Sequence, residues 1–180
     1  ASLTLSPELA GPEITELIRK VRAAGSTVPF ELVVQGNAEA MVAETCIIEP
    51  ILQCRDATTG SPEPERLYGL RDATGRVFPV RIDSSCRTHI LNADETCLLD
   101  HLQALRQAGV SAVAIDARGR AAAYIQESAG IYREAIRAAA SEDPARTSRL
   151  AGLKQRIRQI SRGGITAGHL LRGLKETGVP

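Results

Sequence analysis

Four cysteines are the residues of this 180-residue chain best suited to metal or redox chemistry. In a cytoplasmic protein, cysteines indicate metal binding or redox chemistry more often than disulfide bonds, because the compartment keeps thiols reduced. A [4Fe–4S] cluster needs four thiolates that converge on one point. A zinc site with His89 or His101 as imidazole ligand is one alternative, and free thiols that bind no metal and only fill the core are another. The four thiols are Cys46, Cys54, Cys86 and Cys97.

Hydrolytic chemistry would need a pair of carboxylates, or a nucleophile with its base. Asp56 and Asp116 are the candidates for a carboxylate pair that shares a proton, as in aspartic proteases. Carboxylates that are merely solvated or salt-bridged are the competing interpretation. The chain contains neither the HExxH pattern of zinc peptidases nor the GxSxG pattern of serine hydrolases. The residues alone therefore do not favour proteolysis.

Arginine carries almost all of the positive charge, since only three of the 22 basic residues are lysines. A guanidinium can bind a carboxylate or a phosphate through two parallel hydrogen bonds. Arg118 and Arg120 follow a short apolar segment that ends at Asp116, so they are candidates for binding such an anion. An Arg–Asp pair that only holds a helix in place is the alternative.

The positive charge is concentrated near the C-terminal end. Residues 1–143 carry 14 basic and 20 acidic side chains, whereas residues 144–180 carry 8 basic and 1 acidic. Such a segment attracts RNA phosphates by releasing their counterions. A solvated helix face is the alternative, because no aromatic residues alternate with the arginines to stack bases. The candidate RNA contacts are Arg149, Lys154, Arg156, Arg158 and Arg162.

These groups need a scaffold, and the spacing of apolar residues predicts alternating strands and helices. The predicted strands cover residues 28–36, 77–82, 88–91 and 111–116, and the predicted helices cover residues 14–21, 96–108, 124–140 and 150–160. An irregular stretch is expected over 55–79 and a loop over 161–168. The apolar run 111–115 before Asp116 is typical of a parallel strand that is buried on both faces.

Alternation of this kind predicts a parallel α/β sheet or barrel, in which ligands bind at the carboxyl ends of the strands. Gln35, Gly36 and Asp116 lie at those ends. With 43% hydrophobic and 24% charged residues, the composition suits one compact domain. No apolar run approaches the roughly 20 residues of a membrane helix, and no secretion signal opens the chain. We therefore expect a cytoplasmic protein, and Ala1 at the start suggests a processed chain or a fragment.

Several motifs of the chain resemble those of peptidase family U32, the collagenase-like peptidases. The segment Glu31–Glu49 resembles the family signature without a gap, with Gly36 and Cys46 at matching positions. The other similar motifs are Arg55–Ala57, Ile90–Asn92 with Cys97, Ile115–Arg120, Tyr124, Tyr132–Ile136 and Arg162–His169. They occur in the family's order and at similar spacings, over about residues 3–173.

The resemblance implies a fold and a site. The fold would be the C-terminal part of a modified (β/α)8 TIM-like barrel over residues 1–143, with a long irregular insertion. A basic helical extension over residues 144–180 would pack on the same domain. The ligand contacts implied at the matching positions are Gln35, Gly36, Arg55, Asn92, Arg118 and Arg120.

The resemblance also implies a cofactor, because several members of the family are iron–sulfur proteins. Cys46 and Cys97 occupy family cysteine positions, whereas Glu39 stands where the family has its first cysteine. The family's third cysteine falls near residues 61–62, where this chain has none, so Cys54 and Cys86 are possible replacements. The metal-ligand histidine of the family's His-Gly pair is replaced by Gln35, which weakens the zinc alternative.

Iron–sulfur members of the family are required for oxygen-independent hydroxylation of tRNA, rRNA or ubiquinone. The leading expectation is therefore a role of this kind, on RNA because of the basic tail. A collagenase-like peptidase is the first alternative, as the family name says. The second is a metal-free binding subunit, which could pair with its own copy or with a paralogous U32 protein.

Overall fold

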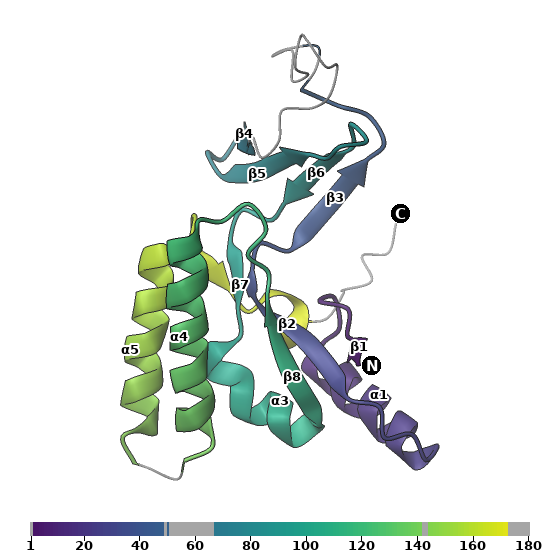
Figure 1. Ribbon diagram of the computed structural model, residues 1–180, viewed down its shortest axis with the longest axis vertical. Coiled ribbons are helices and arrows are strands. Elements are labelled where there is room, and N and C mark those ends of the chain that lie inside the picture. Colours follow the sequence, from purple (N-terminus) through teal and green to yellow (C-terminus); the bar gives the residue numbers. More distant parts are fainter. Residues whose placement is uncertain (1, 49, 51–66, 142–143, 173–180) are drawn as a thin grey trace.

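The computed structural model describes residues 2–48, 50, 67–141 and 144–172. The molecule has two sheets, which follow one another along its long axis, and the helices pack around the larger sheet only (Figure 1). The expected α/β fold is confirmed. The larger sheet holds β1 (Leu3–Thr4), β2 (Phe30–Gly36), β7 (Glu95–Cys97), β8 (Val110–Ile115) and β9 (Ile165–Thr166). The helices are α1 (Gly11–Ala23), α3 (Leu102–Ala108), α4 (Ala122–Ala139) and α5 (Arg146–Ile160), with 3-10 turns η1 (Leu99–His101) and η2 (Gly168–Leu171).

Strand β2 is the centre of the larger sheet. Strand β8 runs parallel to it along one edge, while β1 (parallel) and β7 (antiparallel) share the other edge. Gln35, near the end of β2, is thus opposite Cys97 on one side and Ile115 on the other. Strand β9 extends the sheet beyond β7, with which it is parallel. The sheet is therefore mixed rather than purely parallel as expected, and the described residues form no closed barrel.

The main core lies between the sheet and its helices. Alternate residues of β2, namely Phe30, Leu32 and Val34, are buried, as the strand periodicity predicts. Leu153 and Ile157 of α5 join the same core, and α5 packs along α4. The basic C-terminal helix is therefore part of the main body. None of the described helices is long and apolar enough to cross a membrane.

Two predictions for the larger sheet were wrong. The helix expected over 96–108 begins only at Leu102, because Glu95 and Thr96 pair with β9 on one side and Thr96 and Cys97 pair with β2 on the other. The segment expected to be buried on both faces is β8, in which Ser111 and Ala112 are exposed. Within the described residues β8 pairs with β2 alone, and Val113–Ile115 are only partly buried.

The smaller sheet is entirely antiparallel. It contains, in spatial order, β3 (Glu39–Ala43), β6 (Thr88–Leu91), β5 (Val77–Ile82) and β4 (Leu67–Arg71). Its own small core is Ile48, Val80 and Ile90. Strand β3 was not predicted, and β4 falls within the expected irregular stretch. A carboxylate turn explains β4: Asp72 accepts hydrogen bonds from the backbone N–H groups of Thr74 and Arg76 and so closes the hairpin with β5. Residues 51–66 of that stretch, which include Cys54, Arg55 and Asp56, lie outside the described residues.

Gly36 allows the ends of β2 and β8 to meet. Its backbone φ is +124°, and a Cβ atom there would lie 2.3 Å from the carbonyl oxygen of Asp116. The Asp116 N–H donates to the Gln35 carbonyl at 2.8 Å, which draws the two strand ends together. Only glycine satisfies both the φ angle and the close approach.

Replacing this glycine tests the junction. We expect Gly36→Ala to lower the free energy of unfolding by about 3 kcal/mol, because overpacking and a positive φ both oppose the new side chain. Gly152→Ala is the matched control: Gly152 is an exposed residue of α5, and a Cβ there would meet nothing within 4 Å. The control should raise stability by about 1 kcal/mol or less. Urea denaturation measures both changes, and equal effects would contradict this account of the junction.

Candidate functional site

A cleft of about 660 Å³ lies over the carboxyl ends of β2 and β8. Ligands of parallel α/β sheets bind at this edge, so the position agrees with the expectation from the sequence. Of the predicted site residues, Gly36, Asn92, Asp116 and Arg118 line the cleft. Asn37, Glu39 and His169 are among its other polar residues. The structure thus brings together residues as far apart in the chain as Gly36 and His169, which are 133 positions apart.

Asp116 and Arg118 form an ion pair at the cleft. The Arg118 Nε donates to Asp116 Oδ1 at 2.9 Å and Nη2 donates to Oδ2 at 2.5 Å. Burial opposes ionisation of Asp116, but the Arg118 hydrogen bonds and the charges of Arg118 and Arg81 outweigh it and hold the Asp116 pKa below its usual range. Asp116 is therefore an ionised, weakly basic carboxylate at neutral pH. This suits binding better than the proton transfer expected of a catalytic pair.

In the smaller sheet, beside the cleft, one histidine contacts two carboxylates. His89 of β6 contacts Glu39 Oε2 through Nδ1 at 2.7 Å and Asp83 Oδ2 through Nε2 at 3.0 Å. The His89 hydrogen bond, together with bonds from the backbone, holds the Asp83 pKa well below its usual range. Both ring nitrogens are thus engaged, so zinc binding by His89 would break one of these contacts. His101, the other suggested zinc ligand, lies in η1.

The described cysteines lie in different parts of the fold. Cys97 belongs to the main core, whereas Cys46 packs against the small core of the second sheet and Cys86 lies in the β5–β6 turn with φ +59°. Burial raises the pKa of the Cys97 thiol, whose sulfur lies 3.8 Å from the Tyr132 hydroxyl. No three described Cys, His, Asp or Glu side chains are grouped as metal ligands. The described residues therefore do not fit a [4Fe–4S] cluster.

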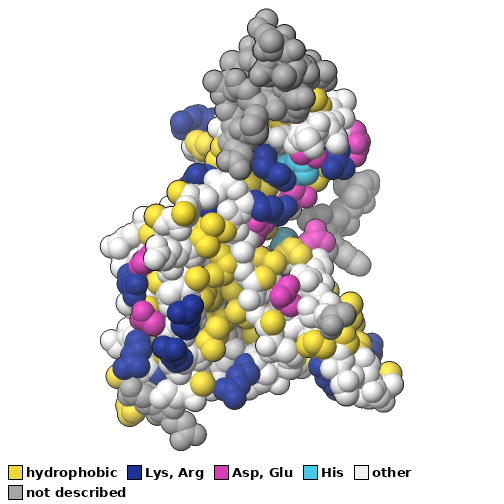
Figure 2. Space-filling model, in the orientation of Figure 1, with side chains coloured by type: hydrophobic (Ala, Val, Ile, Leu, Met, Phe, Trp, Pro, Cys, Tyr) yellow, Lys and Arg dark blue, Asp and Glu magenta, His cyan; other side chains and the backbone are white. Residues whose placement is uncertain are grey.

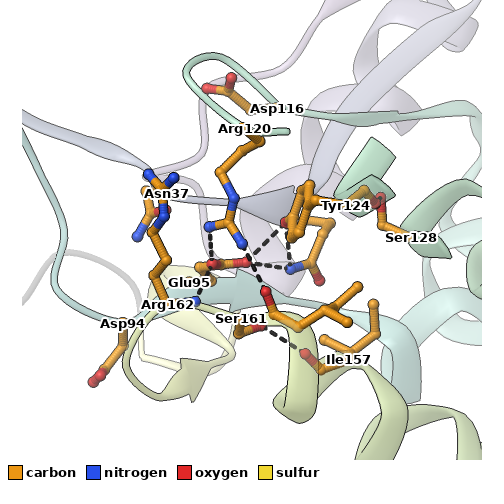
Figure 3. A network of polar contacts seen from close by, with 12 residues as sticks. Asn37, Asp94, Glu95, Asp116, Arg120, Tyr124, Ser128, Ile157, Ser161 and Arg162 are labelled. Atoms are coloured by element: carbon orange, nitrogen blue, oxygen red, sulfur yellow. Dashed lines mark hydrogen bonds and ion pairs between the residues drawn. The ribbon is translucent and has the colours of Figure 1, made fainter. Parts of the chain in front are cut away.

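Beneath the cleft, a fully buried carboxylate, Glu95 of β7, accepts four hydrogen bonds (Figure 3). Its Oε2 accepts from Gln35 Nε2 and from the Tyr124 hydroxyl, each at 2.8 Å. Its Oε1 accepts from the Arg162 backbone N–H at 2.7 Å and from the Arg120 guanidinium. The Arg120 guanidinium also lies 3.7 Å from the centre of the Tyr124 ring. Arg120, predicted to bind a ligand, is thus engaged inside the fold.

Arg120, Tyr124 and Arg162, which all donate to Glu95, lie in three of the motifs that resemble those of family U32. Residues 2–179 match the family model described as peptidase family U32. The chain belongs to peptidase family U32. No curated protein and no solved structure matches the chain. Membership explains why motifs so far apart recur together, since here they meet in one buried network of this U32 protein.

The network also includes Gln35 and Tyr132. Gln35 is fully buried, so it supports the cleft from below and does not line it. The Tyr132 hydroxyl donates to the Val34 carbonyl at 2.8 Å and lies 3.2 Å from Gln35 Oε1. Burial raises the pKa of both Tyr124 and Tyr132, which keeps their hydroxyls protonated as donors. These contacts join the end of β2 to α4.

Glu95 is the site residue that sequence reasoning missed. A signal was present, since this acid lies two positions before the apolar segment Cys97–Leu99, and a carboxylate there needs a cationic partner when it is buried. The partner, Arg120, is 25 positions away. Local sequence cannot say which of the 22 basic residues it would be.

The basic tail of the U32 protein is partly neutralised within the fold. Arg156 pairs with Glu127 at 2.7 Å and with Glu134 at 3.6 Å, and Lys154 pairs with Asp100. Figure 2 shows basic and acidic side chains intermixed over α4 and α5. The remaining candidates for RNA contact, Arg149, Arg158 and Arg162, are exposed. RNA binding by this face stays a prediction.

Removing the buried negative charge tests the network. In Glu95→Gln the buried Arg120 guanidinium loses its counter-charge, so we expect the free energy of unfolding to fall by about 3–5 kcal/mol. Glu127→Gln removes a partly exposed partner of Arg156 and should cost about 1 kcal/mol or less. Urea denaturation of both variants measures the difference. Similar small losses would show that the network is not a structural centre.

The buried thiol and phenols predict a loss of stability in alkali. Because the folded-state pKa values of Cys97, Tyr124 and Tyr132 are raised, folding binds protons that the unfolded chain releases. Their contribution is complete below the ordinary pKa values of about 8.5 for Cys and about 10 for Tyr, and declines as pH rises above them. The urea concentration at the midpoint of unfolding should be highest at pH 7.5, lower at pH 9 and lowest at pH 10.5. Tyr132→Phe should make the decline less steep; an unchanged slope would contradict this origin.

Proposed function

We propose that this chain supplies the substrate-binding cleft of a U32 enzyme that acts on peptides. The observation that carries the proposal is the 660 Å³ cleft in which the Asp116–Arg118 pair meets the carboxamides of Asn37 and Asn92. Membership of a family named for peptidases supports the substrate class. The reaction class is hydrolysis of a peptide bond.

The lining of the cleft is complementary to a peptide end. Arg118 uses Nε and Nη2 for Asp116, which leaves Nη1 to donate to a substrate carboxylate. Arg81 lies beside the pair and adds a second positive charge. The Asn92 side chain makes no hydrogen bond to a described residue, so its carboxamide is available to a peptide group of the substrate.

The weakly basic Asp116 acts in binding in this proposal. It keeps the Arg118 guanidinium in place and attracts N–H donors of the substrate, but its lowered pKa makes it a poor general base. Its suggested catalytic partner Asp56 lies outside the described residues. Oxygen-independent hydroxylation would require an iron–sulfur cluster. Because the described thiols do not fit one, peptide binding is the better supported function.

A barrel-type scaffold is part of the same proposal. Strands β1, β2 and β8 are parallel, α1 connects β1 to β2, and α3 precedes β8. These units are typical of (β/α)8 barrels, whose sites lie at the carboxyl ends of the strands. The position of the cleft supports assigning them to the later part of such a barrel.

Calorimetric titration with the tripeptide Ala-Ala-Leu and its C-terminal amide tests the cleft. We expect the free acid to bind and the amide to bind at least 10-fold more weakly, because Arg118 then lacks a carboxylate. Arg118→Gln should weaken binding of the free acid by a similar factor. Arg158→Gln, an exposed arginine of α5, is the control and should leave binding unchanged. No binding, or equal affinity of the Arg118→Gln variant, would overturn the proposal.

A further inference from the structure

We propose a second binding site in this chain, for a peptide segment in which an acidic residue adjoins a bulky apolar one. The site is a groove of about 530 Å³ between the β4–β5 hairpin and the loop that follows α5. The inference rests on the proposed function, since the segment would belong to the same peptide substrate. The residues that the argument uses are Leu67, Arg76, Val77, Pro79 and Arg162.

One side of the groove is apolar. Leu67 is 37% exposed and Val77 is 43% exposed, although both belong to strands. The β4–β5 register places them with Pro79 on one face of the hairpin, opposite the face that carries Val80 in the small core. Gly69, which pairs with Pro79, has no side chain to cover this face. Apolar surface left open to water in this way favours an apolar partner.

The other side of the groove is cationic. Arg76 pairs with Asp94 at 3.1 Å, whereas the Arg162 guanidinium makes no hydrogen bond or ion pair with a described residue. Two guanidinium groups therefore face one carboxylate, which leaves net positive charge in the groove. A carboxylate of the ligand satisfies Arg162, because the guanidinium can donate two parallel hydrogen bonds to it.

The position of Arg162 is determined by its backbone. Its N–H donates to Glu95 Oε1 at 2.7 Å, and the next residue, Gly163, has φ +78° and packs so closely that a Cβ would lie 2.6 Å from the Ala93 carbonyl oxygen. The Gly164 N–H donates to Asp94 Oδ1 at 3.1 Å. The backbone of the loop is thus anchored to the buried network, and Arg162 is the charged residue of this loop that lines the groove. This arrangement separates a binding role for the side chain from the structural role of the backbone.

Consecutive residues of one segment line the cleft and the groove. Asn92 lines the cleft, while the next two residues, Ala93 and Asp94, line the groove. In this proposal a peptide crosses this segment, with its carboxylate end in the cleft and its acidic-apolar pair in the groove. The groove would therefore select among peptides that the cleft alone binds equally well.

Fluorescence anisotropy with labelled decapeptides tests the groove. The probes are Gly/Ser peptides with a free C-terminal carboxylate. Each peptide carries one Asp-Leu pair, and the position of this pair moves by one residue from each peptide to the next. In the matched control peptides Asn-Leu replaces Asp-Leu. We expect at least one position at which Asp-Leu binds at least 5-fold more tightly than Asn-Leu. In Arg162→Gln that preference should disappear, and Arg158→Gln should retain it. Unchanged urea midpoints show that both variants are folded.

The two proposals fail in distinguishable ways. Arg118→Gln should weaken the binding of all the decapeptides by the same factor, because the cleft holds their carboxylate end. The preference for Asp-Leu over Asn-Leu should persist in this variant. If the Asp-Leu preference persists in Arg162→Gln, or if no position shows this preference, the proposal for the groove is overturned and the proposal for the cleft stands. Binding that does not depend on Arg118 would overturn the cleft. If a single-stranded RNA decamer binds more tightly than every peptide and loses affinity in Arg162→Gln, the groove is not a peptide site.

Discussion

The buried ion pair between Glu95 and Arg120 is the interaction on which the rest of this structure depends. A carboxylate with no exposed surface is tolerated only when its charge is balanced and its oxygens accept hydrogen bonds. Here Arg120 supplies the charge, and Gln35, Tyr124 and the Arg162 N–H supply the remaining donors. Strands β2 and β7, helix α4 and the loop after α5 are thereby joined at one point.

The same network positions both proposed binding sites. Gln35 is followed by Gly36, whose close contact with Asp116 sets the base of the cleft. Arg118 lies two residues after Asp116, in the loop between β8 and α4. The same loop contacts the network through Arg120. On the opposite side, Arg162 is held by its backbone and lines the groove. Binding groups on loops are thus placed by a rigid buried centre rather than by the loops themselves.

In this U32 protein the residues at two of the family's cysteine positions make contacts within the fold. Glu39, which stands at the position of the family's first cysteine, contacts His89, and Asp83 contacts the other nitrogen of the same ring. The contact joins β3 to β6 beside the cleft. Cys97, a retained family cysteine, has its sulfur near Tyr132 in the core. Both family positions therefore serve packing and hydrogen bonding among the described residues.

The sequence by itself determined the family, through the order and spacing of its motifs, and most long elements, because apolar periodicity is a local property. It also placed Asp116 and Arg118 at a strand end, which the structure confirmed. Only the tertiary structure decided the pairing of short strands such as β7, since their backbone partners lie far away in sequence. For the same reason it alone revealed Glu95 as the centre of the network and placed Cys46 and Cys97 in separate cores. Contacts that bring charges and thiols together are made by folding, and residue types alone do not specify them.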